Sequence, residues 1–391
     1  VILMTQSVVL PTADRGTETF KLSPPRQFPA KAEGPFNRLA FAACHVVADP
    51  LAEGDPWLDA AVDWDATIAY RTHLWDLGFG VAEAMDTAQR GMGLDWSGAL
   101  ELIGRSVDAA KGHPGAVVFS GCGTDHLSPS SDLQITDVID AYEQQIEAIE
   151  ALDGRLILMA SRALVAAAKG PEDYALVYER VLRQAREPVI IHWLGEMFDP
   201  ALEGYWGSKD HWQAMETCLE VIKANAFKVD GIKVSLLSKE KEIAMRRRLP
   251  EGVRMYTGDD FNYAELIEGD EQGFSDALLG IFDGIAPAAS AALSALAEGD
   301  NAKFHDILAP TVPLSRHIFK APTRFYKTGI VFLAWLNGHQ DHFTMVGGQE
   351  SGRSTLHLAE LFRLADAAGL IRDPELAASR MAMAMAIRGV S

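Results

Sequence analysis

The feature that most constrains the fold is a regular alternation of short apolar runs with amphipathic segments, which continues from residue 38 to residue 287. Apolar runs of this kind are typical of parallel strands that helices cover on both faces of the sheet. Eight repeats in this length favour a closed barrel over an open doubly wound sheet, and no GxGxxG motif follows the first run. We therefore predict an α/β fold, a (β/α)₈ TIM barrel. The predicted strands lie at 38–47, 79–85, 115–123, 155–161, 188–195, 229–237, 253–261 and 277–287.

The segments on either side of this alternation have a different character. Residues 1–36 are rich in Pro, Thr and charged residues, which predicts an extended N-terminal arm. Residues 291–391 follow a helical pattern almost throughout, which predicts a C-terminal helical region packed on the barrel. We accordingly divide the chain into an arm at 1–36, a barrel at 37–290 and a helical region at 291–391.

Composition and net charge indicate which binding partners to exclude and in which cell compartment to expect the protein. The chain is 48% hydrophobic and 23% charged, as ordinary globular proteins are, and its net charge of −19 argues against nucleic acid and anionic membranes as partners. The three cysteines are far apart and form no CxxC pair, which is typical of a reducing compartment. We find no signal peptide and no apolar run of about 18 residues, the length of a membrane span. We therefore expect a cytoplasmic protein.

A lysine stands at the centre of the sixth predicted strand, in the sequence GIKVSLL. Because side chains alternate along a strand, Gly231, Lys233 and Ser235 share one face, while the apolar Ile232 and Val234 share the other. A buried ammonium loses its water and its pKa falls, so that the amine becomes a nucleophile near neutral pH. The plainer interpretation is a strand-end lysine whose head reaches solvent or a salt-bridge partner.

Five stretches carry a family resemblance through their order and spacing: VVFSGCGT, GIKVSLL, YTGDDF, GIFDGIAP and FYKTGIVFLAWLNG. Together they resemble the dihydrodipicolinate synthase / N-acetylneuraminate lyase family of class I aldolases over most of residues 38–370. The resemblance implies that Lys233 forms the Schiff base, that YTGDDF and GIFDGIAP are the seventh and eighth strands, and that FYKTGIVFLAWLNG is a C-terminal helix.

The same resemblance implies a reaction and an assembly. We expect a lyase or aldolase, or a hydro-lyase, that acts on a keto acid or a keto sugar-like small molecule through the lysine imine. No cofactor beyond that imine is expected. The family also implies a homo-oligomer, a dimer or a tetramer, and a place in carbohydrate metabolism.

The chain departs from the family's pattern at three strand ends. The usual Gly-Thr-Thr-Gly-Glu loop after the second strand reads AMDTAQRGMG, which keeps Thr87 and adds Asp86. The fourth strand's Pro-Tyr-Tyr reads ASRA, and His192 stands in place of the fifth strand's tyrosine. Because imidazole titrates near neutrality, we predict that His192 is the general acid/base beside the imine. The substrate is therefore expected to differ from a simple pyruvate adduct.

Other candidate residues come from the strand ends, where TIM barrels place their catalytic groups. Thr87 and Thr124 could donate hydrogen bonds to substrate oxygens or simply cap a turn. Asp259 or Asp260 could hold the lysine before substrate arrives, bind a substrate hydroxyl, or be a solvated loop carboxylate. The full predicted substrate-binding set is Asp86, Thr87, Gly123, Thr124, Ser161, Ser235, Asp259, Asp260 and Asp283.

Two alternatives remain open at this point. The strand ends carry enough carboxylate and imidazole for a divalent metal, so a metal-dependent lyase or isomerase could use His45, Glu83, His192 and Asp259. No HExxH motif supports such a site. The second alternative is a barrel that binds a sugar without catalysis.

Overall fold

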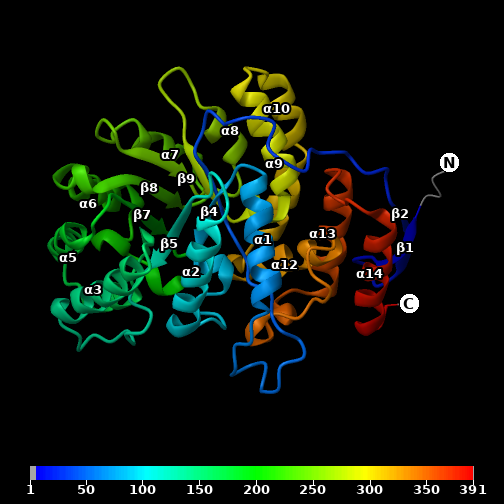
Figure 1. The fold of residues 1–391 in the computed structure, drawn as a ribbon, viewed down its shortest axis with the longest axis horizontal. Helices are drawn as coiled ribbons and strands as arrows, with labels where there is room; N and C mark the ends of the chain where they lie inside the picture. Colours follow the sequence, from blue (N-terminus) through cyan, green and yellow to red (C-terminus); the bar gives the residue numbers. More distant parts are fainter. Residues whose placement is uncertain (1–5, 391) are drawn as a thin grey trace.

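The computed structural model describes residues 6–390, and eight of its strands form a closed parallel barrel (Figure 1). The strands follow each other around the barrel in chain order, and the last closes against the first. The predicted TIM barrel is therefore confirmed. The barrel strands are β3 (Ala40–Ala43), β4 (Gly80–Glu83), β5 (Val118–Cys122), β6 (Arg155–Leu158), β7 (Val189–Leu194), β8 (Val229–Ser235), β9 (Arg254–Thr257) and β10 (Asp276–Leu279).

Helices follow the strands and cover the outside of the barrel (Figure 1). Their apolar stripes pack against the outward-facing residues of the strands in two large clusters of buried side chains. A third, smaller cluster fills the barrel interior and contains Phe41, Phe119, Ile190 and Tyr256. The helices of the barrel are α1 (Trp64–Asp76), α2 (Trp96–Lys111), α3 (Ile135–Ala151), α4 (Arg162–Ala167), α5 (Pro171–Gln184), α6 (His211–Ala224), α7 (Lys239–Arg246), α8 (Tyr263–Glu268) and α9 (Ile281–Ala297).

The eighth strand is shorter than the sequence pattern predicts. Strand β10 ends at Leu279, and the stretch GIFDGIAP, expected as part of a strand, opens the helix α9 instead. Alanines and leucines continue this helix well past its one proline, Pro287, since both residue types favour helix. Residue 290, where we expected the barrel to end, therefore lies inside α9.

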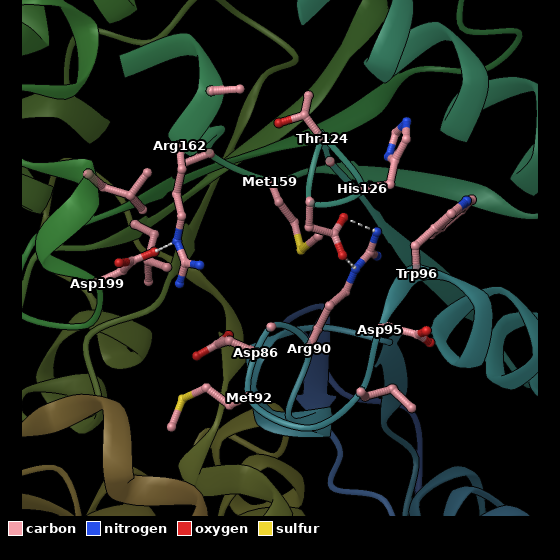
Figure 2. Close-up of a pocket in the computed structure, with 18 of the residues that line it drawn as sticks. Asp86, Arg90, Met92, Asp95, Trp96, Thr124, His126, Met159, Arg162 and Asp199 are labelled. Atoms are coloured by element: carbon pink, nitrogen blue, oxygen red, sulfur yellow. Dashed lines mark hydrogen bonds and ion pairs between the residues drawn. The ribbon is translucent and has the colours of Figure 1, made fainter. Parts of the chain in front are cut away.

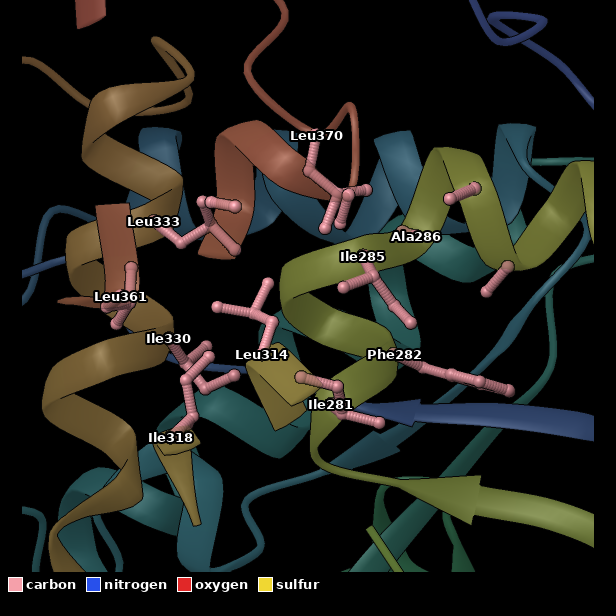
Figure 3. Close-up of a cluster of buried hydrophobic side chains, with 14 of the residues drawn as sticks. Ile281, Phe282, Ile285, Ala286, Leu314, Ile318, Ile330, Leu333, Leu361 and Leu370 are labelled. Carbon is pink, nitrogen blue, oxygen red and sulfur yellow. The ribbon is translucent and has the colours of Figure 1, made fainter. Parts of the chain in front are cut away.

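The C-terminal residues form a helical region on one side of the barrel, as Figure 3 shows for its contact with α9. Ile330 and Leu333 of one helix, with Leu314 and Ile318 of another, belong to the same buried cluster as Ile285. This packing fixes the start of α12 near the carboxyl ends of the strands. The helices are α10 (Asn301–Leu308), α11 (Thr311–Ile318), α12 (Tyr326–Leu336), α13 (Thr355–Ala367) and α14 (Pro374–Ile387).

Part of the predicted N-terminal arm forms regular structure, while its residues 22–36 form neither helix nor strand. Strands β1 (Ser7–Pro11) and β2 (Thr17–Lys21) pair as an antiparallel hairpin beside α13 and α14 (Figure 1). The alternation in SVVLP buries Val8 and Leu10, and the ring of Phe20 meets that of Phe362 with 6.0 Å between centroids. Residues 1–5 of the predicted arm lie outside the described residues. Within residues 6–390, no helix combines the length and apolar character that a membrane crossing requires.

Candidate active site

The predicted lysine and histidine lie side by side on neighbouring strands. Strands β7 and β8 pair in a register that places His192 opposite Lys233. Ile190, two residues before His192, belongs to the cluster inside the barrel, whereas Ile232 and Val234 belong to the outer cluster. Both candidate side chains therefore point into the barrel, as the alternation in GIKVSLL predicts.

The surroundings of Lys233 make its amine a candidate nucleophile. The side chain is buried, and the neighbouring strand end approaches it so closely that a Cβ at Gly258 would lie 2.8 Å from its Cε. Burial lowers the pKa of Lys233, while the carboxyl groups of Asp86 and Asp260 act in the opposite direction. The balance favours the free amine more than in water, and the free amine is the form that attacks a carbonyl.

Asp86 is held as a carboxylate by positive and hydrogen-bonding neighbours. It opens a short 3-10 helix, Asp86–Ala88, directly after β4. Burial alone would raise its pKa, but Lys327, Lys233 and a hydrogen bond from Tyr326 lower it below the ordinary value. The hydroxyl of Tyr326 donates to Asp86 Oδ2 at 2.7 Å and lies 2.6 Å from Thr87 Oγ1. The hydroxyl of Thr87, which we predicted to bind substrate, thus forms a hydrogen bond with Tyr326 instead.

The two aspartates after β9 have different surroundings. Asp259 accepts hydrogen bonds from the backbone of Phe261 and Asn262 and from the amide of Asn262, so it caps the turn into α8. Asp260 accepts one hydrogen bond from the Ile281 N–H at 2.9 Å, and burial raises its pKa to about 8. Asp260 is therefore a carboxylic acid at neutral pH, close enough to Lys233 for each to affect the other's pKa.

The surroundings of His192 act against the expected titration near neutrality. Burial lowers the pKa of His192 well below its ordinary value, and the adjacent Lys233 lowers it further, although Asp86 acts in the opposite direction. The imidazole is therefore neutral near pH 7. Its Nε2 lies 3.1 Å from Ser235 Oγ, which places the predicted Ser235 beside His192.

Figure 2 shows part of the lining of a cavity of about 560 Å³, with Asp86 labelled. His192 and Lys327 also line this cavity. Lys233 is not among the lining residues, although its strand neighbour His192 is. The predicted Gly123 and Thr124 also line the cavity. A Cβ at Gly123 would lie 3.2 Å from Met159 Cε, so this glycine leaves space for a methionine.

Thr124 and Ser161, both predicted to bind substrate, form a hydrogen bond with each other beside the cavity. Thr124 Oγ1 lies 2.6 Å from Ser161 Oγ, and Ser161 also accepts a hydrogen bond from the Leu164 N–H as the N-cap of α4. Ser161 is therefore a structural partner of Thr124 and does not line the cavity. The hydrogen bond between the two hydroxyls thus links the segments that follow β5 and β6.

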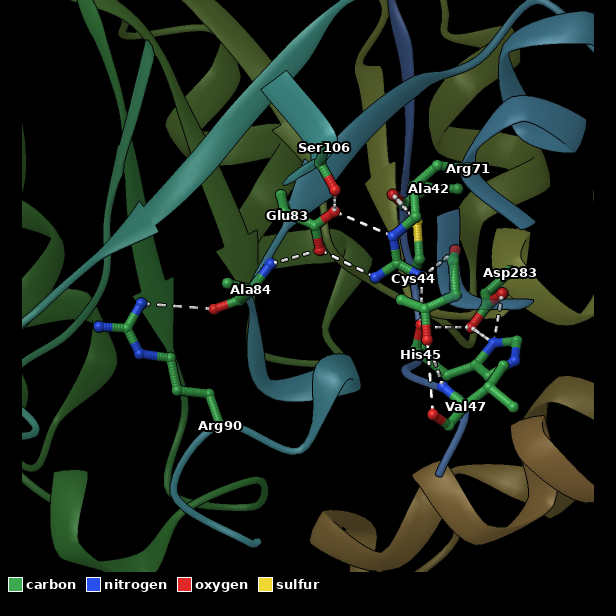
Figure 4. A network of polar contacts seen from close by, with 11 residues as sticks. Ala42, Cys44, His45, Val47, Arg71, Glu83, Ala84, Arg90, Ser106 and Asp283 are labelled. Atoms are coloured by element: carbon green, nitrogen blue, oxygen red, sulfur yellow. Dashed lines mark hydrogen bonds and ion pairs between the residues drawn. The ribbon is translucent and has the colours of Figure 1, made fainter. Parts of the chain in front are cut away.

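Three residues expected at the strand ends belong to a different network (Figure 4). Glu83 points out of the barrel, where its carboxylate binds the buried guanidinium of Arg71 through two 2.9 Å contacts. Asp283 lies in the first turn of α9 and holds the Nδ1 of His45 at 2.9 Å. Both pairs connect barrel elements, and neither reaches the cavity lining.

The four residues of the metal alternative do not come together. His45 is paired with Asp283, Glu83 with Arg71, and Asp259 with the start of α8. Within residues 6–390, no group of three or more His, Cys, Asp or Glu side chains is arranged to hold a metal ion. That alternative set is therefore wrong as a metal site.

Comparison with protein families places the whole chain in one family. The model described as "Protein of unknown function (DUF993)" matches residues 8–390. The chain belongs to the DUF993 family. No curated protein matches its sequence.

Solved structures show that this DUF993 chain shares its fold with dihydrodipicolinate synthases. The enzyme from Aquifex aeolicus aligns with a TM-score of 0.64 at 13% identity, over 85% of this chain and 99% of that one. The 4-hydroxy-tetrahydrodipicolinate synthase from Methylacidiphilum fumariolicum SolV gives 0.63 at 11%, over 88% and 99%. The chloride-inhibited enzyme from Acinetobacter baumannii, complexed with pyruvate, gives 0.62 at 15%, over 85% and 99%. The expected resemblance is confirmed for the fold.

Two residues of the site in this DUF993 protein were not among the sequence candidates. Tyr326 and Lys327 open α12 and reach the barrel mouth from the C-terminal region. Lys327 lines the cavity and donates to the Arg324 carbonyl at 3.1 Å, and its pKa is lowered by burial. The lysine in FYKTGIVFLAWLNG was the available signal, but only the packing of α12 brings it to Asp86.

Proposed function

We propose that this DUF993 protein is a carbon–carbon or carbon–oxygen lyase that forms an imine between Lys233 and a small-molecule carbonyl substrate. The observation that carries the proposal is a buried amine of lowered pKa at the inner face of β8, with an anionic Asp86 and a protonated Asp260 near it. The fold shared with dihydrodipicolinate synthases is consistent with this chemistry.

The proposed reaction begins when the Lys233 amine attacks the carbonyl carbon. A proton moves to the carbonyl oxygen, and the resulting carbinolamine loses water to give the protonated imine. In carbon–carbon cleavage the protonated imine accepts the electron pair of the breaking bond and becomes an enamine. In carbon–oxygen cleavage it accepts the pair of the adjacent C–H bond as a base takes the proton, and the enamine then expels the protonated oxygen as water. Reprotonation of the enamine, where it is needed, and hydrolysis of the imine release the product and Lys233, so the proposed sequence uses no metal or organic cofactor. A homo-oligomeric assembly and a role in carbohydrate metabolism remain predictions.

Three side chains receive distinct roles in this proposal. Asp260 is protonated at neutral pH and supplies the proton that lets water leave. Asp86 is the base, because it is ionised and lines the cavity. His192 stays neutral and serves as a hydrogen-bonding group at the substrate, which replaces the acid/base role expected from its sequence position.

Borohydride trapping tests the proposal. Wild-type protein treated with a panel of keto acids and aldehydes should gain one reduced adduct, and peptide mass mapping should place it at Lys233. Lys233→Ala should keep its circular dichroism spectrum and gain no adduct, whereas the surface variant Lys223→Ala should react as wild type. An adduct on Lys327, the other buried lysine at the site, would transfer the nucleophile's role to α12 and contradict the proposal.

A further inference from the structure

One arginine of the cavity wall has hydrogen-bond donors that no other protein group uses. Arg162 lines the cavity and binds Asp199 through its Nε alone, at 2.5 Å (Figure 2). Among residues 6–390, no group accepts a hydrogen bond from either Nη of this side chain, which is 47% exposed. Its Nη1 lies 3.9 Å from the place that a Cβ at Gly91 would take, and Gly91 also lines the cavity. The edge of the guanidinium that carries both Nη nitrogens is therefore open to a ligand in the cavity.

Arg90 lines the same cavity but has no comparable donors to spare. Its Nε and Nη2 donate to Asp125 at 3.0 and 2.7 Å, and its Nη1 donates to the Gly121 carbonyl. Its Nη2 also donates to Gln145 at 2.6 Å. All three nitrogens of Arg90 therefore hold the wall together. Arg162 has the same planar group and uses one nitrogen, so its two Nη nitrogens can bind an oxyanion through parallel hydrogen bonds.

The carboxylate of Asp199 fixes the direction of this guanidinium. Asp199 Oδ1 accepts the Ala201 N–H at 3.2 Å, at the start of the 3-10 helix Pro200–Leu202, so the carboxylate is itself held by the backbone. Its side chain is mostly buried. A guanidinium that is already held at one edge loses less conformational freedom when a ligand binds its other edge. The pair is therefore suited to ligand binding.

A second cation, Lys327, lies in the same region of the cavity. Burial lowers the pKa of Lys327, and the positive charge of Arg162 lowers it further, although Asp86 and Asp199 act in the opposite direction. Within the described chain its ammonium has one oxygen partner, the Arg324 carbonyl at 3.1 Å, so it can also donate to a ligand. An anion bound by Arg162 would be attracted by Lys327 as well.

The position of Arg162 relative to Lys233 indicates which end of a substrate it would meet. Strand pairing places Leu158 level with Ile191, and Ile191 level with Ile232. Lys233 is the next residue after Ile232, whereas Arg162 comes several positions after Leu158, beyond the end of β6. Strand β7 separates β6 from β8, which adds about 10 Å between the two backbones. A substrate whose carbonyl reaches Lys233 would therefore present a more distant part of its chain to Arg162.

We infer that the substrate carries an anionic group, a carboxylate or a phosphate, remote from its carbonyl, and that Arg162 binds this group. The inference rests on the proposed imine function for the identity of the carbonyl end. Either anion offers oxygens to both Nη nitrogens, and hydrogen bonds between charged groups are about twice as strong as neutral ones. A cavity of about 560 Å³ has room for a substrate longer than a three-carbon keto acid.

Three keto acids of matched chain length and with the same head test the inference. The first, 2-oxoglutarate, ends in a carboxylate, 2-oxo-4-phosphonobutanoate ends in a phosphonate, and 5-methyl-2-oxohexanoate ends in an uncharged isopropyl group. At subsaturating concentration, borohydride-trapped adduct formation should be about tenfold or more faster for at least one charged compound than for the uncharged one. The faster of the two charged compounds identifies the anion. Equal rates for all three, or a faster rate for the uncharged compound, would overturn the inference.

The variant Arg162→Gln tests the same point from the side of the protein. It should bring the ratio of the charged to the uncharged rate close to one, because an amide carries no charge. Arg180→Gln is a matched control, since Arg180 on α5 also binds a carboxylate, that of Glu143, through its Nε at 2.8 Å and lies outside the cavity lining. This control should keep the wild-type ratio. An unchanged ratio in Arg162→Gln, with a normal circular dichroism spectrum, would also overturn the inference.

Calorimetry with Lys233→Ala separates this inference from the proposed function. If no keto acid is trapped on wild-type protein, the imine proposal fails, but binding to this variant still reports on Arg162. Tighter binding of a charged compound than of 5-methyl-2-oxohexanoate, lost when Arg162→Gln is added, would then support the anionic group. Equal or weaker binding, or a preference that survives in the double variant, would contradict it whatever the chemistry proves to be.

Discussion

Two buried lysines, Lys233 and Lys327, lie near the single carboxylate of Asp86 at the candidate site. The positive charges of Lys233 and Lys327 stabilise the carboxylate form of Asp86. The negative charge of Asp86 in turn stabilises the ammonium form of each lysine. Asp260 adds no further negative charge near pH 7, because its pKa is raised to about 8. One carboxylate therefore compensates two buried ammonium groups. If one of the two ammonium groups loses its proton, the site no longer holds an excess of positive charge. This supports the role of Lys233 as a free amine.

The raised pKa of Asp260 leads to a prediction about pH. Below about pH 8 the group is a carboxylic acid and can donate a proton, and above that pH it is ionised and cannot. The rate of imine formation should therefore fall as the pH rises through 8. Asp260→Asn should lose this alkaline limb and slow imine formation by about 10²-fold or more. Rates trapped between pH 6 and pH 10 measure both effects.

The control for this prediction is Asp108→Asn, which changes an exposed carboxylate on α2. It should keep both the rate and the alkaline limb of wild type. An alkaline limb that survives in Asp260→Asn would assign it to another group, and Asp260 would then be only an acceptor for the Ile281 N–H.

At the scale of single residues, alternation along a strand was enough to predict Lys233 and its inward direction. The protonation states were not predictable in this way. His192 and Asp260 depart from their ordinary pKa values because of burial and of neighbours on other strands. Lys233 follows His192 by 233 − 192 = 41 positions, and Asp86 precedes Asp260 by 260 − 86 = 174 positions, so a local pattern carries no information about these neighbours.

At the scale of elements, α12 completes the site from outside the barrel. Its first turn brings Tyr326 to Asp86 and Thr87, and the ring of Tyr326 stacks on that of Phe319 with 4.3 Å between centroids. Helical periodicity predicted a helix here but not where it docks. At the eighth strand the element type itself was predicted wrongly past Leu279. The apolar residues from Ile281 onward fit the pattern of a strand as well as that of a helix, and they form the helix α9.

The variant Tyr326→Phe tests the contribution of α12. It keeps the stacked ring and removes the hydroxyl that donates to Asp86, so the fold should persist while the pKa of Asp86 rises. Because Asp86 must be ionised to act as a base, the acidic limb of the imine-formation rate should move to higher pH. The rate at neutral pH should change little, because the nearby Lys327 and Lys233 still hold Asp86 as a carboxylate there.

A matched variant exists for comparison. Tyr263→Phe also removes a buried hydroxyl, which lies 2.6 Å from Thr311 Oγ1 and away from the cavity. It should leave the pH profile of imine formation unchanged. If Tyr326→Phe and Tyr263→Phe behave alike, the hydroxyl of Tyr326 serves packing only and α12 does not tune Asp86.

At the scale of the whole molecule, the barrel wall contains a buried acid that links its stability to pH. Glu242 on α7 accepts hydrogen bonds from Thr257 at the end of β9 and from Ser275 beside β10, at 2.9 and 2.7 Å. Burial raises its pKa from 4.5 to about 8. The sequence placed Glu242 on an amphipathic helix but could not indicate that its side chain enters the wall between two strands.

The sign of this effect follows from comparing the folded and unfolded chains. Below about pH 4.5 Glu242 is protonated in both states, and its full contribution to stability is present. Between pH 4.5 and pH 8 the unfolded chain releases the proton while the folded chain retains it, which favours unfolding. The free energy of unfolding should therefore fall by up to about 1.4 kcal/mol per pH unit across this range from this group.

Glu242→Gln isolates that contribution, because an amide keeps one donor and one acceptor and does not ionise. Other titrating groups act equally in both proteins and cancel in the difference. Glu242→Gln should thus gain stability relative to wild type as the pH rises from 5 to 8, measured by guanidinium unfolding at several pH values. The exposed Glu251→Gln controls for loss of a negative charge and should show no such trend. A constant difference between Glu242→Gln and wild type would mean that Glu242 ionises in the folded barrel as readily as in the unfolded chain.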